Sequence, residues 1–355
     1  MAFQSRLGGI AVVSLVLAWS AVGLPAESIM QGLEKETQAI FARAKDSVVQ
    51  IKTIVPVVDE RKGEEIGQGL SIGTGFFADN QGHILTAASV LRGADKAVVY
   101  WRGKTYEAQS LGQDKRTNLA LLKIEASTPF LPVGDSEALK VGLMTLVVGY
   151  PADASLSAEY GQVSEPDSIQ IQIPQPPPQN EIRFCVPHIR SNIRVHPGQS
   201  GSPLLNSKGE IVGMVVYATE DGGSTFALPM TAIRKIQRDL AQFHAPRYGW
   251  TGITCEFNFN DIKNPERPVT VRGLYEGCPG HIAGVQFGDV LKKIGNKDIR
   301  TPADLMNATF YLPIGETIKF TIERNGEIQP LPVKISPRPS DKELLTLKPL
   351  PVPAH

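Results

Sequence analysis

Short apolar segments separated by turn residues recur along the first two thirds of the chain, and this pattern constrains the fold more than any other feature. Good strand candidates are Ala97–Trp101, Met144–Val148 and Ile211–Tyr217. Turn-forming runs such as Asp79–Gly82 and Asn206–Gly209 lie between such strands. Many short strands with regular turns indicate an all-β barrel or sandwich. The length of 355 residues suggests about two domains.

The segment His196–Leu205 carries the strongest chemical signal. It consists of a Pro-Gly turn, a serine between small residues, and an apolar run that begins at Leu204. Gly198 lets the backbone bend so that successive N–H groups point to one side. Two converging N–H groups beside the hydroxyl of Ser200 would form an oxyanion hole next to a nucleophile. The same residues also fit an ordinary β-turn between two strands, so this segment alone does not choose between the two interpretations.

Short motifs lie on both sides of this turn, such as Gly73–Phe77 and Gly82–Thr86 before it and Thr225–Pro229 after it. Their order resembles that of the HtrA/DegP family of trypsin-like serine proteases. The resemblance covers roughly residues 30 to 336. It implies a fold dominated by β-structure: a trypsin-like double β-barrel over residues 27–245, with the active cleft between two six-stranded barrels. The matching segments are Gly73–Phe77, Gly82–Thr86, Asn118–Ile124, Gly134–Ser136, Val147–Pro151, Ile189–Asn192, Glu210–Met214 and Thr225–Pro229.

Two of the three catalytic positions implied by the resemblance carry other residues. The family's histidine lies three residues after the threonine of Ile-Leu-Thr, and that position is Ser89 here. The family's aspartate lies just before Leu-Ala-Leu-Leu-Lys, where this chain has Asn118. Only Ser200 keeps the expected residue type, with Gly198 and Ser200 as the expected oxyanion-hole donors.

A serine hydroxyl is a poor nucleophile unless a base takes its proton. Ser89 has no useful basicity near neutral pH, and His83, His188 and His196 are the histidines weighed as substitutes. His83 precedes Ser89 by six residues, about 20 Å along an extended strand. His196 belongs to the turn itself and would reach the hydroxyl from the wrong side. Removing the serine or histidine of subtilisin costs about a million-fold in kcat, so we expect this chain to be inert.

The N-terminus predicts export. Arg6 is followed by an apolar run to about Leu24 and by small-residue sites such as Ala21-Val22-Gly23, which is a secretory signal pattern. The run also approaches membrane-spanning length. Residues 1–26 are therefore expected to be a signal peptide or an N-terminal anchor, and either one places the folded part outside the cytoplasm, in the periplasm or an equivalent extracytoplasmic space.

Three further segments of the first domain have a readable pattern. Glu27–Ala44 and Ile233–Phe243 have apolar residues at helical spacing. Pro174–Asn180 contains four prolines, which favours an extended loop near the cleft. A ligand for a proline-binding module is the alternative for that loop.

A second domain is predicted over residues 246–336. Its motifs include Trp250–Ile253, Ala283–Val285, Phe287–Leu291 and Ile318–Glu323. Their order resembles that of a PDZ domain, a β-sandwich with two helices, in the circularly permuted form of HtrA proteins. The resemblance implies that Thr251, Gly252 and Ile253 offer backbone N–H groups to a peptide C-terminal carboxylate, and that the peptide adds as a strand facing the helix around Asp304–Tyr311. Asn325-Gly326 predicts a hairpin turn. The alternative is a β-hairpin domain that only packs on the barrels.

Two features of the C-terminal region remain. The Pro-rich tail, residues 337–355, is predicted to be disordered. The chain has three cysteines, at positions 185, 255 and 278, without metal-ligand spacing. A Cys255–Cys278 disulfide is an open alternative in an exported chain, because sequence cannot supply the distance test.

Composition bears on the partners. The chain has 36 basic and 36 acidic residues, so its net charge is zero and no global field attracts nucleic acid or an anionic membrane. We expect no cofactor, no metal and membrane contact only through the N-terminal segment. The expected partners are polypeptides with exposed C-termini or unfolded segments, and an active HtrA paralogue is a further candidate. A homo-oligomer, often trimeric, is a family expectation.

These observations support an exported HtrA-like pseudoprotease that acts as a polypeptide-binding chaperone or adaptor through its PDZ domain and cleft. The alternative is an active, ATP-independent endopeptidase that uses Ser200 with a non-standard base such as a lysine or His196. A purely structural protein with both sites vestigial is the third hypothesis.

Overall fold

The computed structural model describes residues 28–59, 65–152, 154–169, 186–219, 222–255, 264–266 and 268–351. The predicted leader, the Pro174–Asn180 loop and Cys185 lie outside these residues. Within the described part of the chain, no helix has the length and apolar content to cross a membrane.

The first barrel closes six antiparallel strands in the order β1-β2-β3-β6-β5-β4. Alternation brings Ile51, Phe77, Ile84 and Leu122 into its interior, each at most 1% exposed. The strands are β1 (Val48–Val58), β2 (Glu65–Phe77), β3 (His83–Ala87), β4 (Lys96–Trp101), β5 (Lys104–Asp114) and β6 (Leu119–Lys123).

The second barrel repeats this architecture with the order β10-β11-β12-β9-β8-β7. Val147, Ile189, Leu204 and Val212 form part of its core. The two closed six-stranded barrels confirm the predicted fold class. The strands are β7 (Met144–Gly149), β8 (Ser157–Ser168), β9 (His188–Ser191), β10 (Pro203–Asn206), β11 (Ile211–Ala218) and β12 (Thr225–Pro229).

Two helices accompany the barrels, near the places where the sequence predicts them. Helix α1 (Ile29–Ala44) begins with a capping box between Ser28 and Gln31, which satisfies two otherwise unpaired N–H groups. Helix α3 (Met230–Phe243) buries one face against both barrels. Two shorter helical segments, η1 (Lys45–Ser47) and α2 (Ala88–Leu91), complete this part of the chain.

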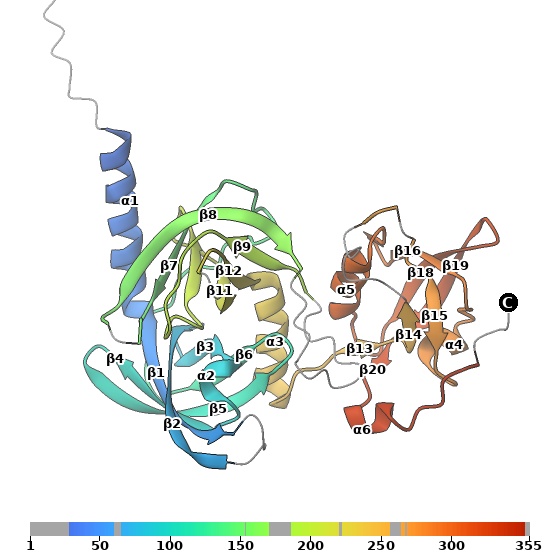
Figure 1. The fold of residues 1–355 in the computed structure, drawn as a ribbon, viewed down its shortest axis with the longest axis horizontal. Helices are drawn as coiled ribbons and strands as arrows, with labels where there is room; N and C mark the ends of the chain where they lie inside the picture. Colours follow the sequence, from blue (N-terminus) through green and yellow to red (C-terminus); the bar gives the residue numbers. More distant parts are fainter. Residues whose placement is uncertain are drawn as a thin grey trace, which may run out of the picture.

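The C-terminal unit lies beside the barrels, on the side where α3 is found (Figure 1). Its four-stranded sheet has the order β17-β16-β18-β19, and two smaller pairs, β13-β20 and β14-β15, complete it. Asn325 and Gly326 have positive φ between β18 and β19, as the predicted hairpin requires. The elements are β13 (Gly249–Trp250), β14 (Ile253–Cys255), β15 (Val271–Leu274), α4 (Pro279–Ile282), β16 (Val290–Ile294), β17 (Lys297–Asp298), α5 (Pro302–Phe310), β18 (Thr317–Arg324), β19 (Glu327–Lys334), β20 (Ser336–Pro337) and α6 (Asp341–Leu344).

The C-terminal segment departs from the predicted disorder of residues 337–355. Its described part, up to Pro351, forms α6 and then runs beside the end of β15. The Leu350 N–H donates to the Leu274 carbonyl at 2.8 Å, and Leu350 packs against the core of the unit. A Pro-rich segment is compatible with a sheet edge, because the missing proline N–H groups are not needed there.

Cys255 and Cys278 are free thiols, so the candidate disulfide is not formed. The Cys278 sulfur instead caps α4 by accepting from the His281 N–H at 3.4 Å. Burial raises the pKa of the Cys255 thiol to about 12, which leaves it protonated and weakly reactive near neutral pH.

His188, in β9, predicts an acid-sensitive step in stability. It is 1% exposed, and burial lowers its pKa to about 4, partly opposed by a hydrogen bond with the Val186 backbone. The unfolded chain binds a proton near pH 6.5, whereas the folded chain does so only near pH 4. The free energy of unfolding should therefore fall by roughly 3 kcal/mol as the pH drops through this window.

Denaturant titrations between pH 7 and pH 4 measure this slope, and His188→Phe should flatten it because phenylalanine does not titrate. Replacing the exposed His244 with asparagine, which also accepts its left-handed backbone, is the matched control. Equal slopes for wild type and His188→Phe would show that His188 is not the origin of the acid sensitivity.

Candidate functional site

The serine turn between β9 and β10 has the shape that its glycine permits. Gly198 has a φ of 95°, and a Cβ there would lie 2.5 Å from the Ala152 nitrogen and 2.7 Å from the Tyr150 carbonyl oxygen. No larger residue fits without moving the backbone. The Gln199 N–H closes the turn by donating to the His196 carbonyl at 3.0 Å.

Two N–H groups of this turn are available to a ligand. The Pro197 carbonyl accepts from the Ala152 N–H at 2.7 Å, so the Gly198 N–H on the same planar peptide points the opposite way. Within the described residues, neither the Gly198 N–H nor the Ser200 N–H donates a hydrogen bond. The turn therefore offers the two donors that an oxyanion hole requires.

A hollow of about 440 Å³ opens beside Ser200. Gly198 and Ser200 line it from the serine turn, and residues 215–219, the end of β11 and the residue after it, also line it. His196 also lines it and is exposed. The hollow has the size and position to receive a side chain of an extended polypeptide.

Ser89 and Asn118, predicted at the histidine and aspartate positions, are brought together by the fold. The Ser89 N–H donates to Asn118 Oδ1 at 2.7 Å, and Asn118 Nδ2 donates to Ser89 Oγ at 3.2 Å. Asn118 Nδ2 also donates to the Val216 carbonyl of β11 at 2.9 Å. Asn118 has a positive φ of 57°, a conformation that asparagine accepts more readily than most residues. The two side chains therefore satisfy each other.

The other candidate bases differ in their placement. His83 begins β3, at the opposite end from Ala87, and its Nδ1 lies 2.6 Å from the Asp79 carboxylate. His188 is buried in the core of the second barrel. Only His196 shares the hollow with Ser200. Among the described residues, no three His, Cys, Asp or Glu side chains are grouped so as to hold a metal ion.

Thr74, on β2, connects the two barrels at this site. Its N–H donates to the Ser200 carbonyl at 2.9 Å, and its hydroxyl donates to the Gly198 carbonyl at 2.8 Å. The same hydroxyl accepts from the Tyr150 N–H at 2.9 Å. Thr74 is fully buried. The serine turn of the second barrel is thus positioned by a residue of the first, which the sequence analysis did not single out.

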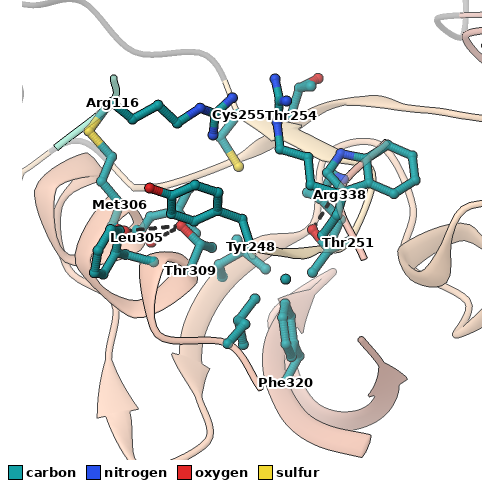
Figure 2. A pocket seen from close by; sticks show the side chains of 16 residues that line it. Arg116, Tyr248, Thr251, Thr254, Cys255, Leu305, Met306, Thr309, Phe320 and Arg338 are labelled. Carbon is teal, nitrogen blue, oxygen red and sulfur yellow. Dashed lines mark hydrogen bonds between the residues drawn. The ribbon is translucent and has the colours of Figure 1, made fainter. Parts of the chain in front are cut away.

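A second candidate site is an elongated pocket of about 300 Å³ between β14 and α5. Figure 2 shows Thr254 and Cys255 of β14 together with Leu305, Met306 and Thr309 of α5. Within the described part of the chain, β14 pairs only with β15, so its other edge is open to an added strand.

Two of the three predicted carboxylate-binding residues, Thr251 and Ile253, line this pocket. The Ile253 N–H donates to Thr251 Oγ1 at 3.4 Å. Gly252 has a φ of 71°, and a Cβ there would lie 2.2 Å from Cys278 Cβ. In the described structure the Thr251 and Gly252 N–H groups donate no hydrogen bond, which leaves two donors for an anion.

Sequence reasoning missed two cations at this pocket, Arg116 and Arg338. Arg116 belongs to the turn after β5 in the first barrel, and Arg338 follows β20. Neither arginine belongs to a sequence motif. The two lie far apart in the chain and meet at the pocket only in the folded structure.

Comparisons with known proteins identify similar sequences and folds. Residues 73–214 match the family described as "Trypsin-like peptidase domain". A "Probable periplasmic serine endoprotease DegP-like" of Pseudomonas putida (strain GB-1) is 31% identical over 291 residues, which cover 79% of this chain and 59% of that protein. The "Putative serine protease HhoA" of Synechocystis sp. is 28% identical over 341 residues, covering 87% and 84%. The chain spans about three fifths of the length of the DegP-like relatives.

Solved structures show the same fold. The "HtrA-type protease AlgW with decapeptide" superposes with a TM-score of 0.67 at 22% identity, covering 86% of this chain and 99% of that one. The "serine endoprotease from Yersinia pestis" gives a TM-score of 0.60 at 22% identity, covering 85% and 98%. The shared fold implies a PDZ domain for the C-terminal unit.

The cross-barrel role of Thr74 can be measured. Thr74→Val removes the hydroxyl while keeping the shape, so the partly buried Gly198 carbonyl and Tyr150 N–H lose their partner. We expect the free energy of unfolding to fall by about 1–3 kcal/mol in denaturant titrations.

Thr53→Val is the matched control. The Thr53 hydroxyl is also buried in the first barrel but has no hydrogen-bond partner in the described structure. That substitution should be neutral or stabilising. Equal effects of the two substitutions would remove the case for a special role of Thr74.

Proposed function

The chain belongs to the HtrA/DegP-like family of trypsin-fold serine proteases, and from this membership we propose that it is an exported pseudoprotease that binds polypeptides. The observation that carries the proposal is the mutual hydrogen bonding of Ser89 and Asn118 at the two positions where the family has its base and its orienting acid. Ser200 keeps its turn, but the residue at the proposed base position is Ser89, whose hydroxyl is not a base near neutral pH.

The chemistry of the pair explains the expected inactivity. In the trypsin-like mechanism a histidine accepts the serine proton, and a neighbouring aspartate stabilises the imidazolium cation that forms. The Asn118 amide nitrogen donates to Ser89 Oγ and to the Val216 carbonyl. An imidazole base would need a hydrogen-bond acceptor from position 118, whereas this nitrogen is a donor. Neither side chain titrates near neutral pH.

The parts that bind polypeptide are retained. The hollow beside Ser200 has two unused N–H donors, and the pocket of the C-terminal unit has an open strand edge. We propose that this unit is a PDZ domain that captures exposed C-termini or unfolded segments, with Thr251, Gly252 and Ile253 as the carboxylate site. A chaperone or adaptor role, a trimeric assembly and pairing with an active paralogue extend this proposal. The names of the DegP-like relatives support a periplasmic or other extracytoplasmic location.

Degradation of casein by the purified chain tests the central claim. We expect the wild type and Ser200→Ala to be equally inert, because loss of the base costs on the order of a million-fold. The double variant Ser89→His/Asn118→Asp should gain activity that Ser200→Ala abolishes in the same background.

Cleavage by the wild type that is lost in Ser200→Ala would overturn the pseudoprotease proposal. His196 is then the residue to replace next, because it lines the same hollow. An inactive double variant with a native fold would instead show that the serine turn itself is defective.

The carboxylate site makes a separate prediction. A fluorescent peptide with a free apolar C-terminus should bind at least about tenfold more tightly than its C-terminal amide, because the amide removes a charge-assisted acceptor. Fluorescence anisotropy with the full chain measures both affinities. Equal binding of the two peptides would exclude carboxylate capture by Thr251–Ile253.

A further inference from the structure

The pocket between β14 and α5 combines an apolar floor with two cations. Ile253, Leu291, Leu312 and Phe320 provide apolar surface, whereas Arg116 and Arg338 are its only charged lining residues among those that the structure describes. In Figure 2 the two arginines lie across the upper part of the pocket and Phe320 lies at its lower end. No acidic side chain among the described lining residues offsets them.

Arg116 is held at the pocket by contacts on both sides. Its backbone N–H donates to Asp114 Oδ1 at 3.1 Å, which fixes the turn after β5. Its guanidinium carbon lies 5.1 Å from the centre of the Tyr248 ring, within cation–π range. The Tyr248 hydroxyl in turn donates to Asp114 Oδ2. The side chain is therefore positioned before any ligand arrives.

The Arg116 guanidinium nevertheless lacks a carboxylate partner. Asp114 is 1% exposed and already accepts from Thr117 Oγ1 at 2.6 Å as well as from Tyr248 and the Arg116 backbone. No ion pair to Arg116 exists within the described residues. A guanidinium presents a planar set of donors that matches a carboxylate, and these donors are free here.

Arg338 adds a second positive charge with a weak internal partner. Its Nη1 donates to Asp341 Oδ1 at 2.9 Å, but the Asp341 side chain is 68% exposed. An exposed ion pair of this kind contributes little free energy, so Arg338 can leave Asp341 for another carboxylate at small cost. A ligand carboxylate inside the pocket is better shielded from water and would compete for Arg338.

We propose that this pocket selects peptides that carry acidic side chains just before an apolar C-terminus, and that Arg116 of the first barrel is the specificity-determining residue. This inference rests on the proposed peptide binding by the same pocket. It follows that the peptide site is completed by the barrel: the C-terminal unit supplies the strand edge and the floor, and the β5–β6 turn supplies the charge.

The test compares two fluorescent octapeptides by anisotropy with the full-length chain. Both end in the same apolar residue with a free carboxylate, and they differ by glutamates or glutamines at the third and fourth positions from the end. We expect the glutamate peptide to bind about tenfold more tightly at low ionic strength. The preference should shrink when salt is raised from about 0.05 M to about 0.5 M, because screening weakens partly exposed pairs.

Arg116→Gln should remove most of this preference, so that the ratio of the two peptide affinities falls from about tenfold to about twofold or less. Arg102→Gln is the matched control, since Arg102 is an exposed arginine of the same barrel that pairs with Asp46 away from the pocket. It should keep the full preference. Arg116→Gln/Arg338→Gln should abolish the preference if both cations act.

The outcomes separate this inference from the function on which it rests. Binding of neither peptide would overturn the peptide-binding proposal as a whole. Equal binding of both peptides, with loss of affinity on C-terminal amidation, would keep that proposal and overturn the acidic selectivity. An undiminished preference in Arg116→Gln would reject Arg116 as the residue responsible.

Discussion

The candidate catalytic cleft depends on one buried threonine that belongs to the opposite barrel. Each barrel is closed, so its backbone hydrogen bonds are satisfied internally and neither barrel requires the other for its sheet. The cleft between them is different. Thr74 binds the carbonyls of Gly198 and Ser200 and the Tyr150 N–H, and these bonds place the serine turn of one barrel against a strand of the other. The Ala152 N–H donates to the Pro197 carbonyl on the other side of the turn, and within the described residues the Gly198 and Ser200 N–H groups donate to no partner, which leaves them for a ligand.

Ser89 and Asn118, at the positions proposed for the base and its orienting acid, are compatible with each other in physical terms. An aspartate at position 118 would face the Val216 carbonyl and a serine hydroxyl, without the imidazole that normally offsets its charge. A partly buried carboxylate in that state is costly. Asparagine has the same shape and donates to both acceptors at 2.9 and 3.2 Å. Without an imidazole at position 89, asparagine is thus favoured over aspartate at position 118, and its amide group is satisfied there.

Much of the fold was predictable from the sequence because its signals are local. Strand alternation, turn residues and helical spacing place β4, β7, β11 and the two long helices of the first domain, and Asn325-Gly326 forms the hairpin turn that its residue types favour. The resemblance to HtrA proteins located Ser89, Asn118 and Ser200, and the structure brings the first two into contact. The spacing of cysteines could not decide the disulfide, since that depends on distances that local sequence does not contain.

The errors and omissions arise where distant segments meet. The Pro-rich tail was predicted to be disordered from its composition, yet Leu350 packs into the core of the C-terminal unit, which a local pattern cannot show. The sequence predicts Thr74 only as a threonine in a strand. Its hydrogen bonds to the serine turn are evident only when both barrels are in place. The sequence predicts Arg116 only as a polar turn residue. Its contact with the Tyr248 ring and its place in the pocket depend on segments distant in the chain.

The turn after β5 joins the two sites of the molecule. Asp114 accepts from Tyr248, which lines the peptide pocket, and from Thr117, which directly precedes Asn118. Asn118 then contacts Ser89 and β11. The segment 114–118 therefore includes Arg116, which lines the peptide pocket, and Asn118, which contacts Ser89 of the candidate catalytic cleft. The buried Asp114 carboxylate is hydrogen-bonded to Thr117 of the barrel and to Tyr248 beside the C-terminal unit. A change in either partner would disturb a hydrogen-bond network that the other one shares. The geometry of the peptide pocket and that of the Ser89–Asn118 pair are consequently set by the same local structure.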